Sequence, residues 1–517
     1  MKASPRRRAH RVVAVVAAIA AASLALSGCL YAMIPEEAVS TSSPAPDTAG
    51  VPEELLPYYE QELDWTACDE GLDCTTVTAP LDWADPSKGE LELSVIRSRA
   101  AGGDPIGSLI TNPGGPGVSG VGLIRDSLTF AVGEPLREQF DVIGFDPRGV
   151  GESTAVTCFD DADMDAYLYE IPENERGTDA WSDELLERHA AFAEACDANS
   201  DGILPYITTT NSARDIDLLR AVLGDSALNY LGYSYGTFLG ATYAELYPDK
   251  VGRLVLDGAV DPAISGVEMN VTQGIGFESA LRAYMADCLE SSECPFRGSV
   301  DDAMADLGAL LASVDRDPLP AADGRELGAD SLLTAIVAAL YSQESWEYLT
   351  LALDGALQGD PETAFLLADF YNNRENGSYV GNQTEAFRAY NCMDYPVDAT
   401  EADIAAAKEH LAAEAPTVAP YWFGPDSCEV WPYPPTGERG EITAEGAAPI
   451  VVVGTTNDPA TPYEWSVALA EQLSSGVLIT RQGEGHTGYN KGSDCVDDAV
   501  ERYLLDGTVP EDGLTCG

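Results

Sequence analysis

The chain is 517 residues long, and its 86 acidic side chains far outnumber its 28 basic ones, so its formal net charge is −58. A surface of this sign repels nucleic acid and anionic lipid headgroups, which excludes both as partners of the folded domain. The length predicts more than one domain, or one domain that carries an insertion.

Residues 1–28 predict an export signal. Basic residues at the start precede an apolar segment, residues 12–26, that is too short to span a membrane as a mature helix. This segment ends in Leu-Ser-Gly before Cys29, which resembles a bacterial lipobox, so we expect cleavage there and a lipid on the Cys29 sulfur. An ordinary secretory signal cut elsewhere is the alternative. Residues 29–55 then form a flexible tether, and we expect an exported protein that is lipid-anchored to the outer face of a bacterial cell membrane or secreted.

Cysteine usage agrees with export. Of the 11 cysteines, Cys29 belongs to the lipobox, and an even number remains, which predicts disulfides in an exported chain. Their local spacing favours neighbour pairing: Cys68–Cys74, Cys158–Cys196, Cys288–Cys294, Cys392–Cys428 and Cys495–Cys516. The sequence contains no Cys-x-x-Cys motif or Cys/His cluster, so we expect neither a metal nor a cofactor.

Strand-like and helix-like segments alternate along much of the chain. Helical patterns such as residues 212–223 separate the strand-like segments, which are residues 91–97, 107–111, 140–145, 227–231, 253–257, 449–454 and 476–480. The first has the alternation of an edge strand, and the whole pattern predicts an α/β protein with a mostly parallel, doubly wound sheet. Residues 56–261 and 441–517 would form this core. Residues 262–440 are mainly amphipathic helix and predict a helical cap inserted over the carboxyl ends of the strands.

Ser234 is the predicted nucleophile. It stands in Gly-Tyr-Ser-Tyr-Gly, residues 232–236, between a strand-like and a helix-like segment, which is the setting that a G-x-S-x-G motif requires. The following helix N-terminus favours a developing negative charge. Two backbone amides should stabilise the oxyanion: that of Tyr235, and one from the glycine-rich loop 112–117, where Gly115 is the expected donor.

A serine nucleophile needs a base, and the base is usually histidine. His10 leaves with the signal, while His189 and His410 lie in charged helical segments without a preceding strand. His486 lies in a glycine-rich loop directly after the last strand of the pattern. We therefore predict His486 as the base.

The orienting acid should follow the preceding strand, which points to Asp458. It would hold the imidazole tautomer and stabilise the imidazolium. Asp257 and Asp261, after the strand that follows the nucleophile helix, remain alternatives, and Glu484 is a weaker one.

Together these motifs resemble the secreted tripeptidyl aminopeptidases, α/β-hydrolase serine peptidases related to proline iminopeptidase. The resemblance spans residues 55–517 and rests on an ordered set of segments: 112–117, 145–149, 232–236, 391–394, 454–459 and 485–486. One departure is Asn112-Pro113 before two glycines, where proline iminopeptidases have histidine. The resemblance implies an α/β-hydrolase fold and cleavage of short peptides from N-termini, although some family members resemble esterases.

Three functions follow from these predictions. The first is a serine exopeptidase that releases short peptides from free N-termini through an acyl-enzyme. The second is a carboxylesterase with the same triad. The third is a non-catalytic lipoprotein that binds peptides, which has no need of an ordered triad. Asp394 and Glu344 in the cap are candidates for holding a substrate ammonium, and we expect a monomer that acts on short peptides or esters.

Overall fold

The computed structural model describes residues 45–437 and 439–517. The predicted signal peptide, Cys29 and the tether up to residue 44 lie outside the described residues. Among the described helices, none has the length and apolar character needed to cross a membrane.

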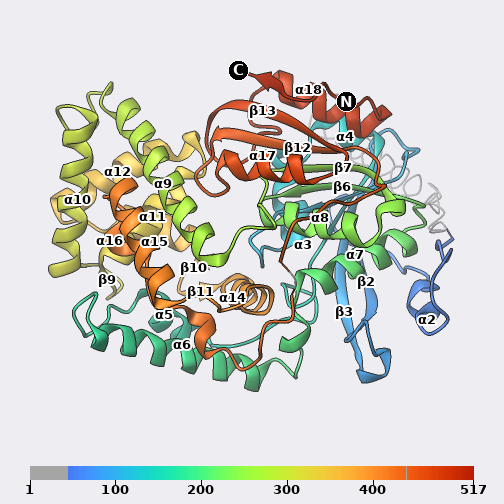
Figure 1. Cartoon of the computed structure of the whole chain (residues 1–517), viewed down its shortest axis with the longest axis horizontal. Coiled ribbons are helices and arrows are strands. Elements are labelled where there is room, and N and C mark those ends of the chain that lie inside the picture. Colours follow the sequence, from blue (N-terminus) through green and yellow to red (C-terminus); the bar gives the residue numbers. More distant parts are fainter. Residues whose placement is uncertain (1–44, 438) are drawn as a thin grey trace, which may run out of the picture. The chain divides into compact units, whose positions relative to one another are not determined.

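A ten-stranded sheet forms the centre of the described chain (Figure 1), with strand order β1-β2-β3-β5-β4-β6-β7-β12-β13-β14. Its strands are β1 Thr66–Asp69, β2 Leu72–Pro80, β3 Glu90–Ser98, β4 Ser108–Asn112, β5 Asp141–Phe145, β6 Leu228–Tyr233, β7 Val251–Asp257, β12 Ile450–Asn457, β13 Gly476–Glu484 and β14 Leu514–Cys516. All neighbours from β5 to β14 pair in parallel, and only the pairings among β1, β2, β3 and β5 are antiparallel. The predicted mostly parallel α/β fold is therefore confirmed.

The prediction of an edge strand at residues 91–97 is wrong. These residues belong to β3, which lies third in the sheet because β1 and β2 add two strands outside it. β2 pairs with β3 along its whole length, from Leu72 opposite Ser98 to Pro80 opposite Glu90. Leu91, Leu93 and Val95 are buried on one face of β3, whereas Glu90 and Glu92 are exposed on the other. The alternation at the start of this strand therefore reflects solvent on one face rather than an open edge.

Helices cover both faces of the sheet because successive strand residues point to opposite sides. Leu254 and Leu256 of β7 pack in one apolar cluster with α7 and α8, whereas Val255 packs in another with α3, α4 and α18. The core helices are α2 Leu56–Tyr59, α3 Gly120–Ala131, α4 Glu134–Gln139, α7 Thr209–Val222, α8 Tyr235–Leu246, α17 Tyr463–Gln472 and α18 Asp494–Asp506.

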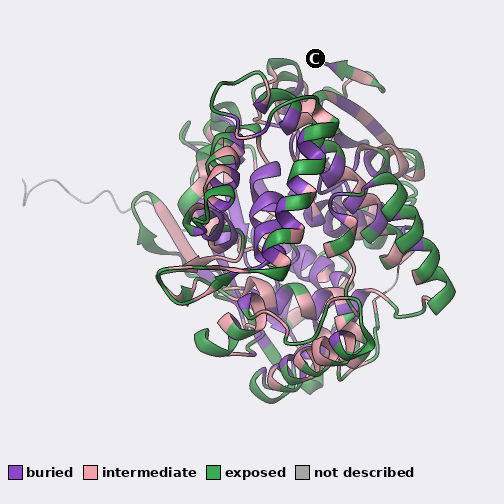
Figure 2. Ribbon diagram, turned by 90° about the vertical axis from the view of Figure 1, so that its left-hand side faces the viewer, coloured by how far each residue is buried: buried purple, intermediate pink, exposed green. Residues whose placement is uncertain are grey.

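Mostly helical segments, here called the cap, lie between β7 and β12 in the chain. The cap comprises α9 Gly266–Cys288, α10 Val300–Arg316, α11 Ala329–Leu340, α12 Trp346–Gln358, α13 Glu362–Tyr371, α14 Gln383–Asp394, α15 Glu401–Glu414 and α16 Ala419–Trp422. Two short hairpins accompany these helices, β8 Leu319–Pro320 with β9 Glu326–Leu327, and β10 Arg374–Glu375 with β11 Ser378–Tyr379. The cap has an apolar cluster of its own, and Figure 2 shows buried helical stretches within a rim of exposed ones on this side.

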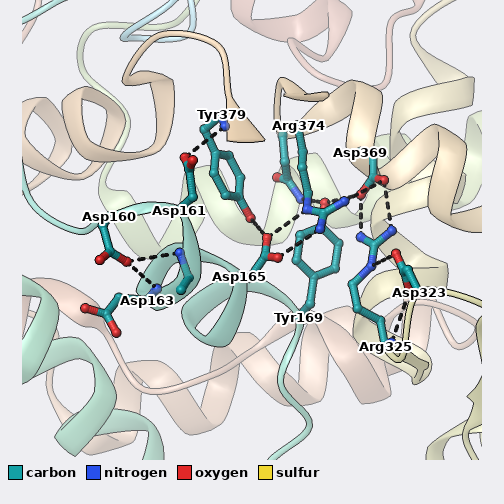
Figure 3. A network of polar contacts seen from close by, with 12 residues as sticks. Asp160, Asp161, Asp163, Asp165, Tyr169, Asp323, Arg325, Asp369, Arg374 and Tyr379 are labelled. Carbon is teal, nitrogen blue, oxygen red and sulfur yellow. Dashed lines mark hydrogen bonds and ion pairs between the residues drawn. The ribbon is translucent and has the colours of Figure 1, made fainter. Parts of the chain in front are cut away.

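A second helical segment, which we assigned to the core from sequence, packs with the cap. It consists of α5 Asp161–Tyr169 and α6 Asp179–Asn199, between β5 and α7. The Arg374 guanidinium forms two ion-pair contacts with Asp165 of α5, at 2.7 and 2.8 Å. The Tyr379 hydroxyl donates to the same carboxylate at 2.7 Å (Figure 3).

The same polar network extends to Arg325, Asp369 and Tyr169. The Arg325 guanidinium donates to both carboxylate oxygens of Asp369, at 2.6 and 2.9 Å, and the Tyr169 hydroxyl donates to Asp369 at 2.7 Å (Figure 3). Paired guanidinium–carboxylate bonds of this kind give geometric specificity as well as attraction. They fix α5 to α13 and to both hairpins, so the cap is built from two parts of the chain.

All five disulfides expected from the cysteine spacing are present: Cys68–Cys74, Cys158–Cys196, Cys288–Cys294, Cys392–Cys428 and Cys495–Cys516. The longest closed loops are those of Cys158–Cys196 and Cys392–Cys428, with sequence separations of 38 and 36 residues. Cys392 lies on α14 and Cys428 in the segment that follows α16, so this bond fastens the end of the cap to α14. Such links stabilise the fold mainly by restricting the unfolded chain.

Candidate active site

Ser234 occupies the sharp turn between β6 and α8. Its φ of 55° and ψ of −124° are unusual for a residue other than glycine, and such strain is typical of an exposed serine on a strand-to-helix turn. The turn is held by the Ser234 amide, which donates to the carbonyl oxygen of Asp257 at 2.9 Å. The Ser234 carbonyl oxygen accepts from the amide and hydroxyl of Thr237, at 2.8 and 2.6 Å.

The glycines on either side of this turn are required by close backbone approach. A Cβ at Gly232 would lie 2.5 Å from the carbonyl oxygen of Gly236, and a Cβ at Gly236 would lie 2.8 Å from that of Asn112. Both distances are shorter than real Cβ contacts. Glycine at both positions is what allows the serine to stand at the tip of the turn.

His486 and Asp458 meet at the carboxyl ends of β13 and β12. These strands pair in parallel, so the loops that follow them emerge at one edge of the sheet. The Nδ1 atom of His486 lies 2.9 Å from each carboxylate oxygen of Asp458. Asp458 is 2% exposed, and the His486 side chain is 10% exposed. A buried carboxylate in this position orients the imidazole and stabilises its protonated form.

Four further donors hold the Asp458 carboxylate. The amides of Ala460 and Thr461 donate to Oδ1 at 3.0 and 2.9 Å. The Thr461 hydroxyl and the Thr487 amide donate to Oδ2, both at 3.0 Å. A buried charge needs such partners, and together they fix the orientation of the carboxylate. Sequence analysis missed Thr461 and Thr487, although both lie within three residues of a predicted site residue.

The other candidates for the acid have different partners. Asp257 is buried at the end of β7, and its carboxylate accepts from the amides of Gly488 and Tyr489 at 2.8 Å each. Burial raises the pKa of Asp257 to about 6, although these amides oppose the rise. Asp261 accepts from the Ala263 amide at 2.9 Å and from a glutamine side chain, and Glu484 accepts from an asparagine side chain. Of these four carboxylates, that of Asp458 is therefore the one that lies within hydrogen-bond distance of the His486 imidazole.

Ser234 and His486 lie on either side of one turn. Ser234 is bonded to Asp257, and a Cβ at the adjacent Gly258 would lie 3.2 Å from Cε1 of His486. Within residues 45–437 and 439–517, no hydrogen bond joins the Ser234 hydroxyl to the imidazole. In free enzymes this bond is often long and tightens only with substrate.

The glycine-rich loop lies directly on the nucleophile turn. A Cβ at Gly114 would lie 2.5 Å from the carbonyl oxygen of Tyr233 and 2.9 Å from Cβ of Ser234. The Gly114 amide donates to the Asn112 side chain at 3.0 Å, which holds the loop. In the described part of the chain, the amides of Gly115 and Tyr235 have no hydrogen-bond acceptor. An oxyanion hole requires unpaired amides of this kind, here one next to the serine and one in the adjoining loop.

The two cap carboxylates singled out from sequence differ in their surroundings. Asp394 is 3% exposed, and its carboxylate accepts from the Thr209 amide and hydroxyl, at 3.0 and 2.6 Å. Burial raises the pKa of Asp394 to about 6. Glu344 is exposed in the short helix 343–345, and its carboxylate has no bonded partner within the described residues.

The remaining described histidines lie in other surroundings. Nδ1 of His189 lies 3.1 Å from the Tyr167 hydroxyl, and burial lowers the pKa of His189 to about 4. His410 is exposed on α15. Across the described residues, no group of His, Cys, Asp and Glu side chains is arranged to hold a metal ion.

Two families match this chain, the α/β hydrolase fold family over residues 107–307 and the TAP-like protein family over residues 415–516. The serine protease Hip1 of Mycobacterium tuberculosis is 35% identical over 100% of both chains. Carboxylesterase B of the same species is 36% identical over 91% of this chain and 94% of its own. Tripeptidyl aminopeptidase of Streptomyces lividans is 31% identical over 88% of this chain and 86% of its own. These matches confirm the resemblance that the motifs indicate.

Proposed function

We propose that this chain, which belongs to the α/β-hydrolase family of the tripeptidyl aminopeptidases, is a serine exopeptidase that releases short peptides from free N-termini. Family membership makes it a serine hydrolase, and its serine protease and aminopeptidase relatives support a peptidase. The observation that carries the proposed triad is the Asp458–His486 pair, with 2.9 Å between Nδ1 and both carboxylate oxygens, beside the strained turn of Ser234.

The first half of the reaction forms an acyl-enzyme. With the Nδ1 proton of His486 donated to Asp458, Nε2 is free to take the proton from the Ser234 hydroxyl. The serine oxygen attacks the peptide carbonyl carbon, and the amides of Gly115 and Tyr235 donate to the resulting oxyanion. His486 then gives the proton to the departing amine, the C–N bond breaks, and the short peptide stays esterified to Ser234.

The second half releases the product. Nε2 of His486 takes a proton from a water molecule, whose oxygen attacks the ester carbonyl carbon. The same two amides stabilise the second oxyanion. As it collapses, the bond to the serine oxygen breaks and His486 returns its proton to that oxygen, which regenerates Ser234 and frees the peptide carboxylate.

Glu344 is the stronger candidate for binding the substrate ammonium. Its carboxylate is exposed and forms no hydrogen bond or ion pair within the described chain, although its charge interacts with that of Lys491, whereas the carboxylate of Asp394 is occupied by Thr209. Glu344 also lies three residues after Tyr341, whose carbonyl oxygen accepts from the His486 amide at 2.9 Å. Glu344 therefore follows closely on the cap residue that contacts the His486 loop.

The alternative function, a carboxylesterase, would use the same catalytic residues. The relative named carboxylesterase B supports this alternative. A non-catalytic peptide-binding lipoprotein accounts for none of the catalytic geometry, because binding needs neither a strained serine nor an oriented imidazole.

The lipid anchor on Cys29 and the monomeric state also belong to this proposal. Mass spectrometry of the mature protein from its native membrane tests the anchor through a lipid-bearing N-terminal peptide.

A matched substrate panel tests the exopeptidase proposal. It contains one tripeptidyl arylamide with a free N-terminus, the same compound acetylated at its N-terminus, and the corresponding tripeptidyl aryl ester. We expect the free arylamide to yield intact tripeptide and the acetylated one to react at least about tenfold more slowly, because an ion pair to the ammonium is lost. Ser234→Ala should abolish all three reactions.

Two outcomes contradict the proposal. Equal rates for free and acetylated arylamides indicate an endopeptidase or an unselective amidase, and turnover of the ester alone indicates a carboxylesterase. Glu344→Gln should raise KM for the free arylamide and leave KM for the acetylated one unchanged.

A further inference from the structure

The cap directly contacts the loop of the proposed base. Tyr341 follows the last residue of α11, and its carbonyl oxygen accepts from the His486 amide at 2.9 Å. Gly485, with φ of 91°, makes this approach possible, since a Cβ there would lie 3.0 Å from the same carbonyl oxygen. The backbone of the cap and that of the His486 loop are therefore bonded and closely packed.

The side chain of Tyr341 makes a second contact with the same histidine. The phenol ring and the imidazole meet edge to face, with centroids 5.2 Å apart and planes at 84°. Aromatic pairs prefer this geometry, which gains attraction beyond simple burial. Tyr341 thus contacts both the backbone and the ring of His486.

Tyr341 is itself held by the cap. Its ring packs against Phe277 of α9 and Tyr371 of α13, with centroids 6.1 Å apart in both pairs. Every residue of α11 except Asp330 and Thr334 is buried, so the helix that carries Tyr341 is firmly packed. Burial raises the pKa of the Tyr341 phenol well above its ordinary value, and the ring therefore stays neutral beside the histidine.

Asp458 alone leaves one motion of the imidazole unrestrained. Its two carboxylate oxygens are equidistant from Nδ1 at 2.9 Å, so they fix that atom but allow the ring to tilt about it. Nε2 lies on the far side of the ring, where a tilt moves it most. A catalytic group must stay within about 0.5 Å of its working position, and contact with a second rigid group provides that restraint.

We propose that Tyr341 is a positioning residue through which the cap holds His486 in the orientation that serves Ser234. This inference rests on the proposed function, since it takes His486 as the base. The cap then contributes to the rate of the chemical step as well as to substrate binding. Loss of the ring should lower kcat while leaving KM nearly unchanged, because the tyrosine acts on the base rather than on the substrate.

The test compares Tyr341→Leu with Tyr341→Phe, which keeps the ring and loses only the hydroxyl. Tyr348→Leu is the matched control, because it makes the same substitution in the same cap at a residue that is 46% exposed. We expect Tyr341→Leu to lower kcat about tenfold on the free tripeptidyl arylamide, the upper end of what one aromatic pair supplies. Its KM should change less than about twofold, and Tyr341→Phe and Tyr348→Leu should keep kcat within about twofold of wild type.

Three results overturn the inference: unchanged kcat in Tyr341→Leu, an equal loss in Tyr341→Phe, or a change confined to KM. Thermal midpoints show whether each variant is folded, and Tyr341→Met, with its long apolar side chain, takes the place of Tyr341→Leu if the latter is not. The Ser234→Ala variant distinguishes a failure of the proposed function from a failure of the positioning role of Tyr341. Activity in Ser234→Ala overturns the proposed function, whereas an inactive Ser234→Ala with a fully active Tyr341→Leu overturns the positioning role alone.

Discussion

The substitution Asp458→Asn removes one carboxylate charge and keeps the shape of the side chain. Oδ1 accepts from the amides of Ala460 and Thr461, while among the described residues the only backbone donor to Oδ2 is the Thr487 amide. An asparagine therefore loses least if its oxygen takes the Oδ1 position and its NH2 group takes the Oδ2 position. Because Nδ1 of His486 lies 2.9 Å from both Oδ1 and Oδ2, the NH2 group then comes as close to Nδ1 as the amide oxygen does.

This arrangement makes the wrong tautomer available. Where Nδ1 accepts the amide proton, the imidazole carries its own proton on Nε2 and has no lone pair for the nucleophile. The expected loss in kcat is about 10⁴-fold, which corresponds to about 5 kcal/mol of barrier. An unpaired Thr487 amide should also cost about 1–3 kcal/mol of folding free energy.

The assay measures kcat and KM for the free tripeptidyl arylamide and its ester, with urea unfolding of each variant as a measure of folding. Asp261→Asn is the matched control, because Asp261 bonds Ala263 and Gln472 rather than the imidazole. We expect that variant to keep kcat within about twofold of wild type, as for a residue that makes no contact with the reacting groups. A kcat for Asp458→Asn within about tenfold of wild type refutes the assignment of the acid.

Three further predictions concern neighbouring features. The pKa of about 6 for buried Asp257 lies above its unfolded value, so this group stabilises the fold at low pH and loses that stabilisation as pH rises through about 6. The destabilisation by Asp257→Asn in urea should therefore be about 2 kcal/mol larger at pH 4.5 than at pH 7.5, and an equal effect at both contradicts the shift. Gly114→Ala should lower kcat at least about 100-fold by displacing the oxyanion loop. Gly103→Ala is the control and should leave kcat unchanged, because Gly103 has a similar φ of 99° but no described atom lies within 4 Å of its Cβ. Mass spectrometry of the unreduced mature protein should find no free thiol among the ten cysteines of the predicted pairs, and several free thiols would rule out the five bonds. Reduction should lower the thermal midpoint of the protein.

The core of the fold could be predicted because its signals are local. Parallel strands buried on both faces appear as short apolar runs such as Ile450 to Val453, and each is followed by a loop at the same sheet edge. Ser234, Asp458 and His486 each follow such a run. The order of the strands in the chain therefore indicated which side chains would lie together.

The missed parts depend on partners that are distant in sequence. The hairpin of β1 and β2 mixes exposed and buried residues, so it carries no clear apolar signal. The helices α5 and α6 pack with the cap through pairs such as Arg374 with Asp165, which are 209 residues apart. Tyr341 likewise contacts His486 only because the end of α11 lies against the loop that follows β13, and no spacing rule connects the two.

The central claim is that Ser234 is the nucleophile, and covalent labelling tests it most directly. The wild-type protein and Ser234→Ala are each treated with a fluorophosphonate, digested, and analysed by tandem mass spectrometry. We expect one phosphonyl adduct, located on Ser234 in the peptide that spans β6 and α8, and no adduct in Ser234→Ala. An adduct on any other residue, or equal labelling of Ser234→Ala, contradicts the account.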